Sequence, residues 1–136
     1  RVMPTLRRIV LVLTAAAMIG ACAHGRTPGL PTAPEAAAGQ VTIVRNNNLF
    51  GWGFSVAAVF NDVPVAHLRA GEHVTFLTTP GLHTVGVFGR GISFAVEANR
   101  KYFFLISADD SQAGFDIERL DPTRGEEWVA KTKSSL

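Results

Sequence analysis

Residues 58–87 read AVFNDVPVAHLRAGEHVTFLTTPGLHTVGV, and this stretch decides the fold class. Short runs of β-branched and aromatic residues alternate with polar ones, and turn residues such as Asn61-Asp62 and Pro80-Gly81 separate the runs. From residue 41 onward such runs recur roughly every 8–12 positions, a spacing typical of β-sandwiches and barrels. The chain therefore predicts an all-β domain, which we expect to be an antiparallel β-sandwich built as a meander.

The same alternation places the expected strands and one helix. The strands are expected near 41–45, 54–60, 63–68, 72–78, 82–88, 92–97, 101–107 and 115–120. Pro64 has no N–H to donate, so its strand is expected at the edge of a sheet. Residues 124–133 predict a short C-terminal helix that docks Trp128 and Val129 on a sheet.

Pro80-Gly81 predicts a hairpin turn between the fourth and fifth strands. Pro presets φ and Gly supplies a positive φ there. Placing Phe76 opposite Val85 would bring Val74, Phe76, Val85 and Val87 to one face. His83 lies next to this turn, and we expect its ring to bond the hairpin backbone as a structural residue.

The first 21 residues are expected to be a signal peptide. Arg7 and Arg8 precede an apolar run over Ile9–Ile19, which is too short to span a bilayer in comfort, since about 20 residues are needed. Of the 13 basic residues, three precede Cys22 and no acidic residue does. The rest of the chain then holds ten basic and eleven acidic residues, so no basic stripe remains and nucleic-acid binding is not expected.

Ile19-Gly20-Ala21-Cys22 resembles the lipobox of bacterial lipoproteins, in which an aliphatic and two small residues precede a cysteine. The resemblance implies cleavage before Cys22 and diacylglycerol on its sulfur, which would attach the protein to a bilayer. Ala23 follows where Asp would favour retention at the inner membrane, so the resemblance points to the outer membrane, facing the periplasm. The alternative is a cysteine that happens to follow a plain signal peptide.

Residues 22–40 are expected to form the lipidated cysteine and a flexible tether, and residues 41–136 the sandwich. Residues 23–40 carry three Pro, three Gly and no hydrophobic periodicity. Such a tether would reach about 60 Å when fully extended.

The stretch 58–87 also resembles small PEGA-like bacterial β-domains, carried by Val65, Leu68, Gly71, Pro80, Gly81 and His83 together with the Asn61-Asp62 turn. ISFAVEANRKYFFLIS, residues 92–107, resembles the family's aromatic hairpin, and the match covers roughly residues 41–120. Val63 departs from the pattern, which has Gly after the turn. The resemblance implies an immunoglobulin-like or PEGA-like meander in a lipoprotein of a domain-of-unknown-function family, and it carries no chemistry.

No catalytic, metal or cofactor site is predicted. His67, His73 and His83 fall on different strands and faces of the expected meander. A calcium loop starting at Asp109 would lack coordinating oxygens at Ala113 and Leu120. We therefore expect a protein that is not an enzyme.

One segment, NNNLFGWGFS at 46–55, bears on function. Phe50, Trp52 and Phe54 alternate with smaller residues and could share one face. They are expected either in the core, which we favour, or on an exposed loop that contacts the bilayer or a protein partner. The favoured function is a membrane-anchored envelope lipoprotein acting as a scaffold or protein-interaction module. The alternatives are a binder of a small apolar or glycan ligand in a cleft near Trp52 and a subunit of a larger envelope machine.

Overall fold

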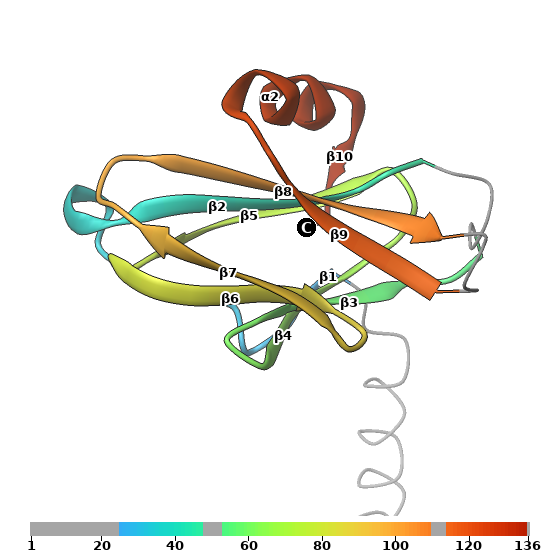
Figure 1. Cartoon of the computed structure of the whole chain (residues 1–136), viewed down its shortest axis with the longest axis horizontal. Helices are drawn as coiled ribbons and strands as arrows, with labels where there is room; N and C mark the ends of the chain where they lie inside the picture. The colour runs from blue at the N-terminus through green and yellow to red at the C-terminus, as the bar shows by residue number, and fades with distance from the viewer. Residues whose placement is uncertain (1–24, 48–52, 110–113, 136) are drawn as a thin grey trace, which may run out of the picture.

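The computed structural model describes residues 25–47, 53–109 and 114–135. In this part of the chain two five-stranded sheets pack face to face, and one helix lies over the outer side of the second sheet (Figure 1). Sheet A has the order β1 (Gly25–Arg26), β4 (Val63–Leu68), β3 (Val56–Phe60), β6 (Gly81–Val87) and β7 (Arg90–Val96). Sheet B has the order β10 (Lys133–Ser134), β5 (Glu72–Thr78), β2 (Gly39–Arg45), β8 (Lys101–Asp109) and β9 (Gly114–Leu120). The predicted all-β sandwich is confirmed.

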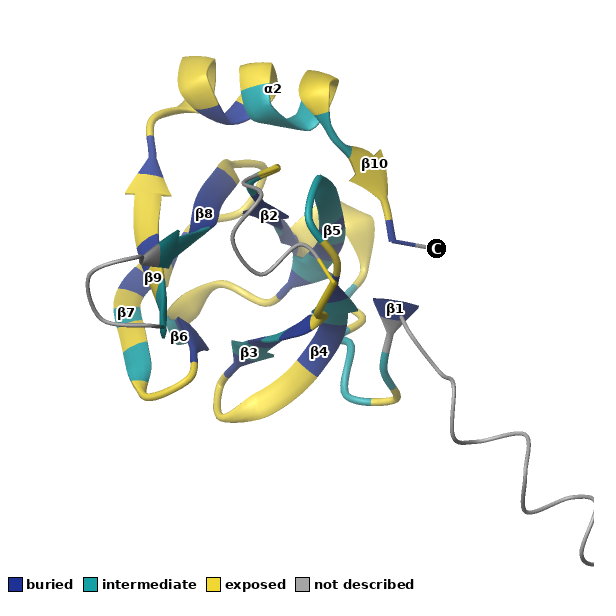
Figure 2. Ribbon diagram, turned by 90° about the vertical axis from the view of Figure 1, so that its right-hand side faces the viewer, coloured by how far each residue is buried: buried dark blue, intermediate teal, exposed yellow. Residues whose placement is uncertain are grey.

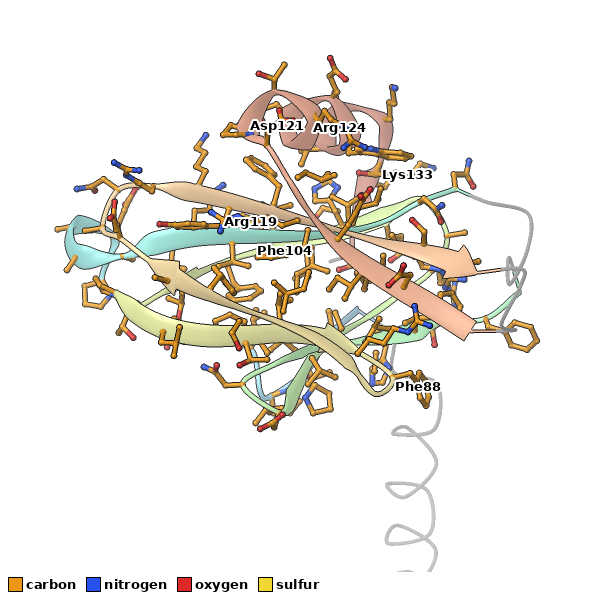
Figure 3. All side chains as sticks on the ribbon, viewed as in Figure 1. Phe88, Phe104, Arg119, Asp121, Arg124 and Lys133 are labelled. Atoms are coloured by element: carbon orange, nitrogen blue, oxygen red, sulfur yellow. The ribbon has the colours of Figure 1, made fainter. Side chains whose placement is uncertain are left out.

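The core lies between the sheets because each strand turns alternate residues inward. Sheet A supplies Phe60, Val85 and Phe94, and sheet B supplies Phe76 and Phe104, all buried in one cluster. The rings of Phe94 and Phe104 meet across the two sheets with centroids 4.7 Å apart. Figure 3 shows Phe104 between the layers.

The predicted hairpin between residues 72–78 and 82–88 is wrong. β5 pairs with β2, where Phe76 faces Val41, whereas β6 pairs with β3 and β7 in the other sheet. Val74, Phe76, Val85 and Val87 are all buried, but they meet from opposite sheets. Alternation tells which side chains face the core and leaves the partner strand open, so the Pro80-Gly81 segment joins two sheets instead of two neighbouring strands.

The meander is also not wholly antiparallel. β2 runs parallel to β8, and the short β10 runs parallel to β5. Sheet B is therefore mixed, while every pairing described in sheet A is antiparallel.

The tight turn predicted at Asn61-Asp62 is confirmed. Phe60 pairs with Val63 across it, and Asn61 and Asp62 have φ values of 49° and 64°. Two successive left-handed residues are the signature of a type I′ turn, for which Asn and Asp are suited. Asp62 itself takes up this conformation, so Val63 begins β4 without a glycine.

The expectation of a flexible tether is wrong for residues 25–40. Gly25 pairs with His67 in β4, and the Thr27 N–H donates to the Val65 carbonyl at 3.1 Å. Leu30 then packs on the core, and the chain passes through a short 3₁₀ turn, η1 (Glu35–Ala37), into β2. The open edge of β4 supplies partners that composition alone does not reveal. It also means that Pro64 lies on a strand that only the two-residue β1 separates from the sheet edge.

The C-terminal helix is confirmed as α2 (Pro122–Lys131). The Asp121 side chain caps its first turn by accepting the Arg124 N–H at 3.0 Å, and Pro122 occupies the first helical position. Trp128 and Val129 pack on a second apolar cluster on the outer side of sheet B, formed by Val44, Phe103, Leu105 and Leu120. Figure 2 shows α2 lying over this side. No helix in the described ranges is long and apolar enough to cross a membrane.

Candidate interaction surface

Several residues singled out in the sequence lie outside the described ranges. Cys22, Phe50 and Trp52 are among them, so their predicted roles stay predictions. Phe54 is described: it stands two residues before β3 and its surface is 71% exposed. Burial of the aromatic segment in the core is therefore wrong for Phe54.

His83 connects two turns through hydrogen bonds. Its Nε2 lies 2.7 Å from the Thr79 carbonyl oxygen, and its Nδ1 lies 2.9 Å from the Asn61 amide nitrogen. With Nε2 protonated, the ring donates to Thr79 and accepts from Asn61, whose own oxygen accepts the Thr84 N–H at 3.0 Å. The ring also stacks on Phe60 at 5.1 Å. These contacts tie the Asn61-Asp62 turn to the Pro80-Gly81 connection, where Gly81 has a φ of 128°.

The three histidines do not converge. His73 contacts the Thr132 hydroxyl at 2.8 Å, far from the His83 contacts on the other sheet, and His67 pairs with Gly25 at the β1 edge. Burial lowers the pKa of His73. Within the described residues no group of three His, Cys, Asp or Glu side chains is placed to hold a metal ion.

The outer side of sheet A has few charged residues. The register sets Val59, Gly86 and Gly91 side by side, and it pairs Thr84 with Ser93 and Leu82 with Ala95. By strand alternation these residues point away from the core. We call the following set the sheet A face: Ala57, Val59, Leu82, Thr84, Gly86, Gly91, Ser93 and Ala95. The described strands of sheet A contain two Lys, Arg, Asp or Glu residues, Arg26 of β1 and Arg90 at the start of β7. Asp62 is exposed in the β3–β4 turn, and His67 pairs with Ala57 of the face.

Exposed apolar side chains gather on this same sheet. In the described ranges the large exposed hydrophobic residues are Phe54 (71%), Val63 (46%), Leu82 (76%) and Phe88 (77%). Each lies on a strand of sheet A or on a segment directly flanking one. Scattered exposed apolar residues are ordinary on a protein surface, whereas several of them on one layer make that layer a candidate interaction surface. Sheet B differs, because α2 covers its outer apolar cluster.

A hollow interrupts the sheet A face near the β6–β7 turn. It has a volume of about 310 Å³, and its lining combines Val59, Thr84, Gly86 and Gly91 with two charged residues, Asp62 and Arg90. A Cβ on Gly86 would lie 2.6 Å from the Arg90 carbonyl oxygen, so no larger residue fits there. The neighbouring turn holds Phe88 at a φ of 22°. A bulky residue with positive φ is strained, and such strain is commonest where an exposed side chain has a function.

Arg90 does not break the apolar character of the face. Its guanidinium forms an ion pair with Asp116 of β9 at 3.0 Å, which turns its charge toward the sheet B edge of the sandwich. The charge is therefore partly compensated within the domain.

Sequence reasoning missed Arg45, which holds Phe54 in place. Its guanidinium is buried, donates to the Leu68 carbonyl at 2.8 Å and to the Phe54 carbonyl, and lies 5.1 Å above the Phe115 ring. Burial lowers the pKa of Arg45, and the Glu72 carboxylate opposes that shift. One charge at the end of the apolar run VTIVR was the signal that could have indicated a buried, hydrogen-bonded side chain.

Comparison with protein-family profiles, curated proteins and solved structures finds no match for this chain.

Proposed function

We propose that this protein is a lipid-anchored lipoprotein of a bacterial cell envelope, and that its sandwich is a non-enzymatic interaction module. The anchor rests on the lipobox resemblance around Cys22. The interaction role rests on one structural observation: the large exposed apolar side chains of the described residues lie on or beside sheet A, whose outer side has few charged residues.

Physical chemistry supports this role for the sheet A face. An interface is easily dehydrated when it contains few ionic groups, because burial of an unpaired charge is costly. Leu82 and Phe88 offer large apolar surfaces on or beside a sheet that is held rigid by pairing on both sides of β6. The ligand-binding alternative near Trp52 stays a prediction, since Trp52 lies outside the described residues.

The anchor is tested by metabolic labelling with a fatty-acid analogue. The wild-type chain should take up the label, and Cys22→Ser should lose it and accumulate as an uncleaved precursor. Secretion of a soluble, unlabelled wild type contradicts the proposal.

The interaction surface is tested by the reactivity of introduced thiols. Acylation blocks the sulfur of Cys22, the chain's one cysteine, so Ser93→Cys on the sheet A face would carry the one free thiol. Its reaction with a water-soluble maleimide should be several-fold slower in native envelopes than in detergent-purified protein. Glu127→Cys, on the exposed side of α2, is the matched control and should react equally in both. Equal rates for both positions in envelopes argue against a covered sheet A face.

A further inference from the structure

The distance between the proposed anchor and the domain is short. β1 begins at Gly25, three residues after Cys22, and three residues span at most about 11 Å in any conformation. Backbone hydrogen bonds hold this segment on β4, and Leu30 fixes the following residues on the core. The domain therefore lacks the roughly 60 Å reach that a free segment over residues 23–40 would provide.

The anchored end lies on one layer of the sandwich. β1 is the outermost strand of sheet A, whereas α2 lies over sheet B on the opposite side (Figures 1 and 2). Four strand spacings separate β1 from β7, about 19 Å at the usual spacing between strands. A bilayer that holds Cys22 therefore lies next to the β1 edge of sheet A, whereas α2 lies on the other sheet.

The side of the sandwich covered by α2 and the outer side of sheet A also differ in charge. α2 presents Arg124, Glu126, Glu127 and Lys131 to the solvent. Figure 3 shows Asp121 and Arg124 on the side of the sandwich opposite Phe88. The sheet A face has fewer such groups: Asp62 and Arg90 line its hollow, and Arg90 is paired with Asp116, so contact with the headgroup and acyl boundary dehydrates little charge there. Phe88 and Leu82 are the apolar side chains suited to enter that boundary.

We propose that the partner of the sheet A face is the lipid surface itself, with Leu82 and Phe88 in contact with the bilayer to which Cys22 is attached. This inference rests on the proposed acylation of Cys22 and names the partner of the same surface. The short link keeps the face at a high effective concentration near the lipid, so weak contacts are enough to hold one orientation.

The test uses the full acylated chain in vesicles of phosphatidylethanolamine and phosphatidylglycerol that contain brominated lipid. An environment-sensitive dye is attached to Ser93→Cys or, as the matched control, to Glu127→Cys. We expect the lipid bromines to quench the dye at residue 93 several-fold more than the dye at residue 127. Equal quenching at the two positions overturns the proposal.

A charge on the face separates specific contact from mere proximity. Leu82→Glu is an exposed substitution that leaves the core intact, and Ala130→Glu is its counterpart on the exposed side of α2. Leu82→Glu should abolish most of the quenching at residue 93, and Ala130→Glu should leave it unchanged. Unaltered quenching in Leu82→Glu overturns the proposal.

Two further outcomes separate this inference from the proposed function. A thiol at residue 93 that is shielded in native envelopes but free in pure lipid vesicles means a protein partner, which overturns the inference and leaves the interaction module standing. A chain that takes up no fatty acid overturns both.

Discussion

Gly125→Ala tests how closely α2 is seated on sheet B. A Cβ on Gly125 would lie 2.1 Å from Cγ, 2.5 Å from Cδ2 and 2.6 Å from Cβ of Phe103. Non-bonded carbon atoms prefer about 3.5–4.0 Å, so the helix and the ring would have to separate by roughly 1.5 Å. Phe103 is buried, so its ring has little room to move.

Two effects of opposite sign set the size of the change. Alanine in a helix interior is favoured over glycine by about 0.8–1.0 kcal/mol. Overpacking a filled site costs typically about 1–3 kcal/mol, and three clashing carbons place this one toward the upper end. Separation would also loosen Trp128 and Val129 on their cluster. We expect a net loss of about 1–2 kcal/mol, which lowers the melting temperature of a domain of this size by roughly 5–15 °C.

The measurement is thermal unfolding followed by circular dichroism of the strands. Gly53→Ala is the matched control, because a Cβ there would meet no atom within 4 Å and its melting temperature should stay within error. In a Phe103→Ala background the penalty of Gly125→Ala should shrink, since the clashing Cγ and Cδ2 atoms are gone. A Gly125→Ala protein that melts at or above the wild-type temperature would refute this packing.

Three further predictions probe other contacts. Gly29→Ala would place a Cβ 2.4 Å from Val63 Cγ1, so it should detach the segment around Thr27 from β4 and speed hydrogen exchange of the Thr27 amide. An unchanged exchange rate would contradict the packing of this segment on β4. Arg45→Met keeps the apolar bulk but removes the donor of the Leu68 and Phe54 carbonyls. Urea unfolding should show that the free energy of unfolding is lower by about 2–4 kcal/mol. A free energy unchanged within error would contradict the assigned role of Arg45. Because burial lowers the pKa of His73, the unfolded chain binds a proton more readily than the folded chain does. The free energy of unfolding should therefore fall as the pH drops below about 6.5 toward the lowered pKa. His73→Gln should reduce this pH dependence in thermal melts between about pH 7 and pH 5, and an equal dependence in both proteins would contradict it.

The features that could be predicted from the sequence depend on neighbouring residues. Alternation placed the strands, Asn61-Asp62 formed the tight turn, and α2 appeared with Trp128 and Val129 on a sheet. The pairing of strands could not be predicted in the same way, because Phe76 and Val85 face the same core from different sheets. Arg45 was missed for a related reason: its acceptors on Phe54 and Leu68 converge only after β3 and β4 have paired.

The candidate surface depends on a part of the chain that composition misrepresented. Pro28, Pro31 and Pro34 resemble a disordered linker, yet proline also restricts the unfolded chain, so few contacts are needed to hold such a segment. The contacts are provided by β4, about 40 residues further along the chain, together with the core site that receives Leu30. A segment expected to hold the domain away from Cys22 is thus part of the domain from Gly25 onward. If Cys22 carries the proposed lipid, the sparsely charged outer side of sheet A lies close to the bilayer.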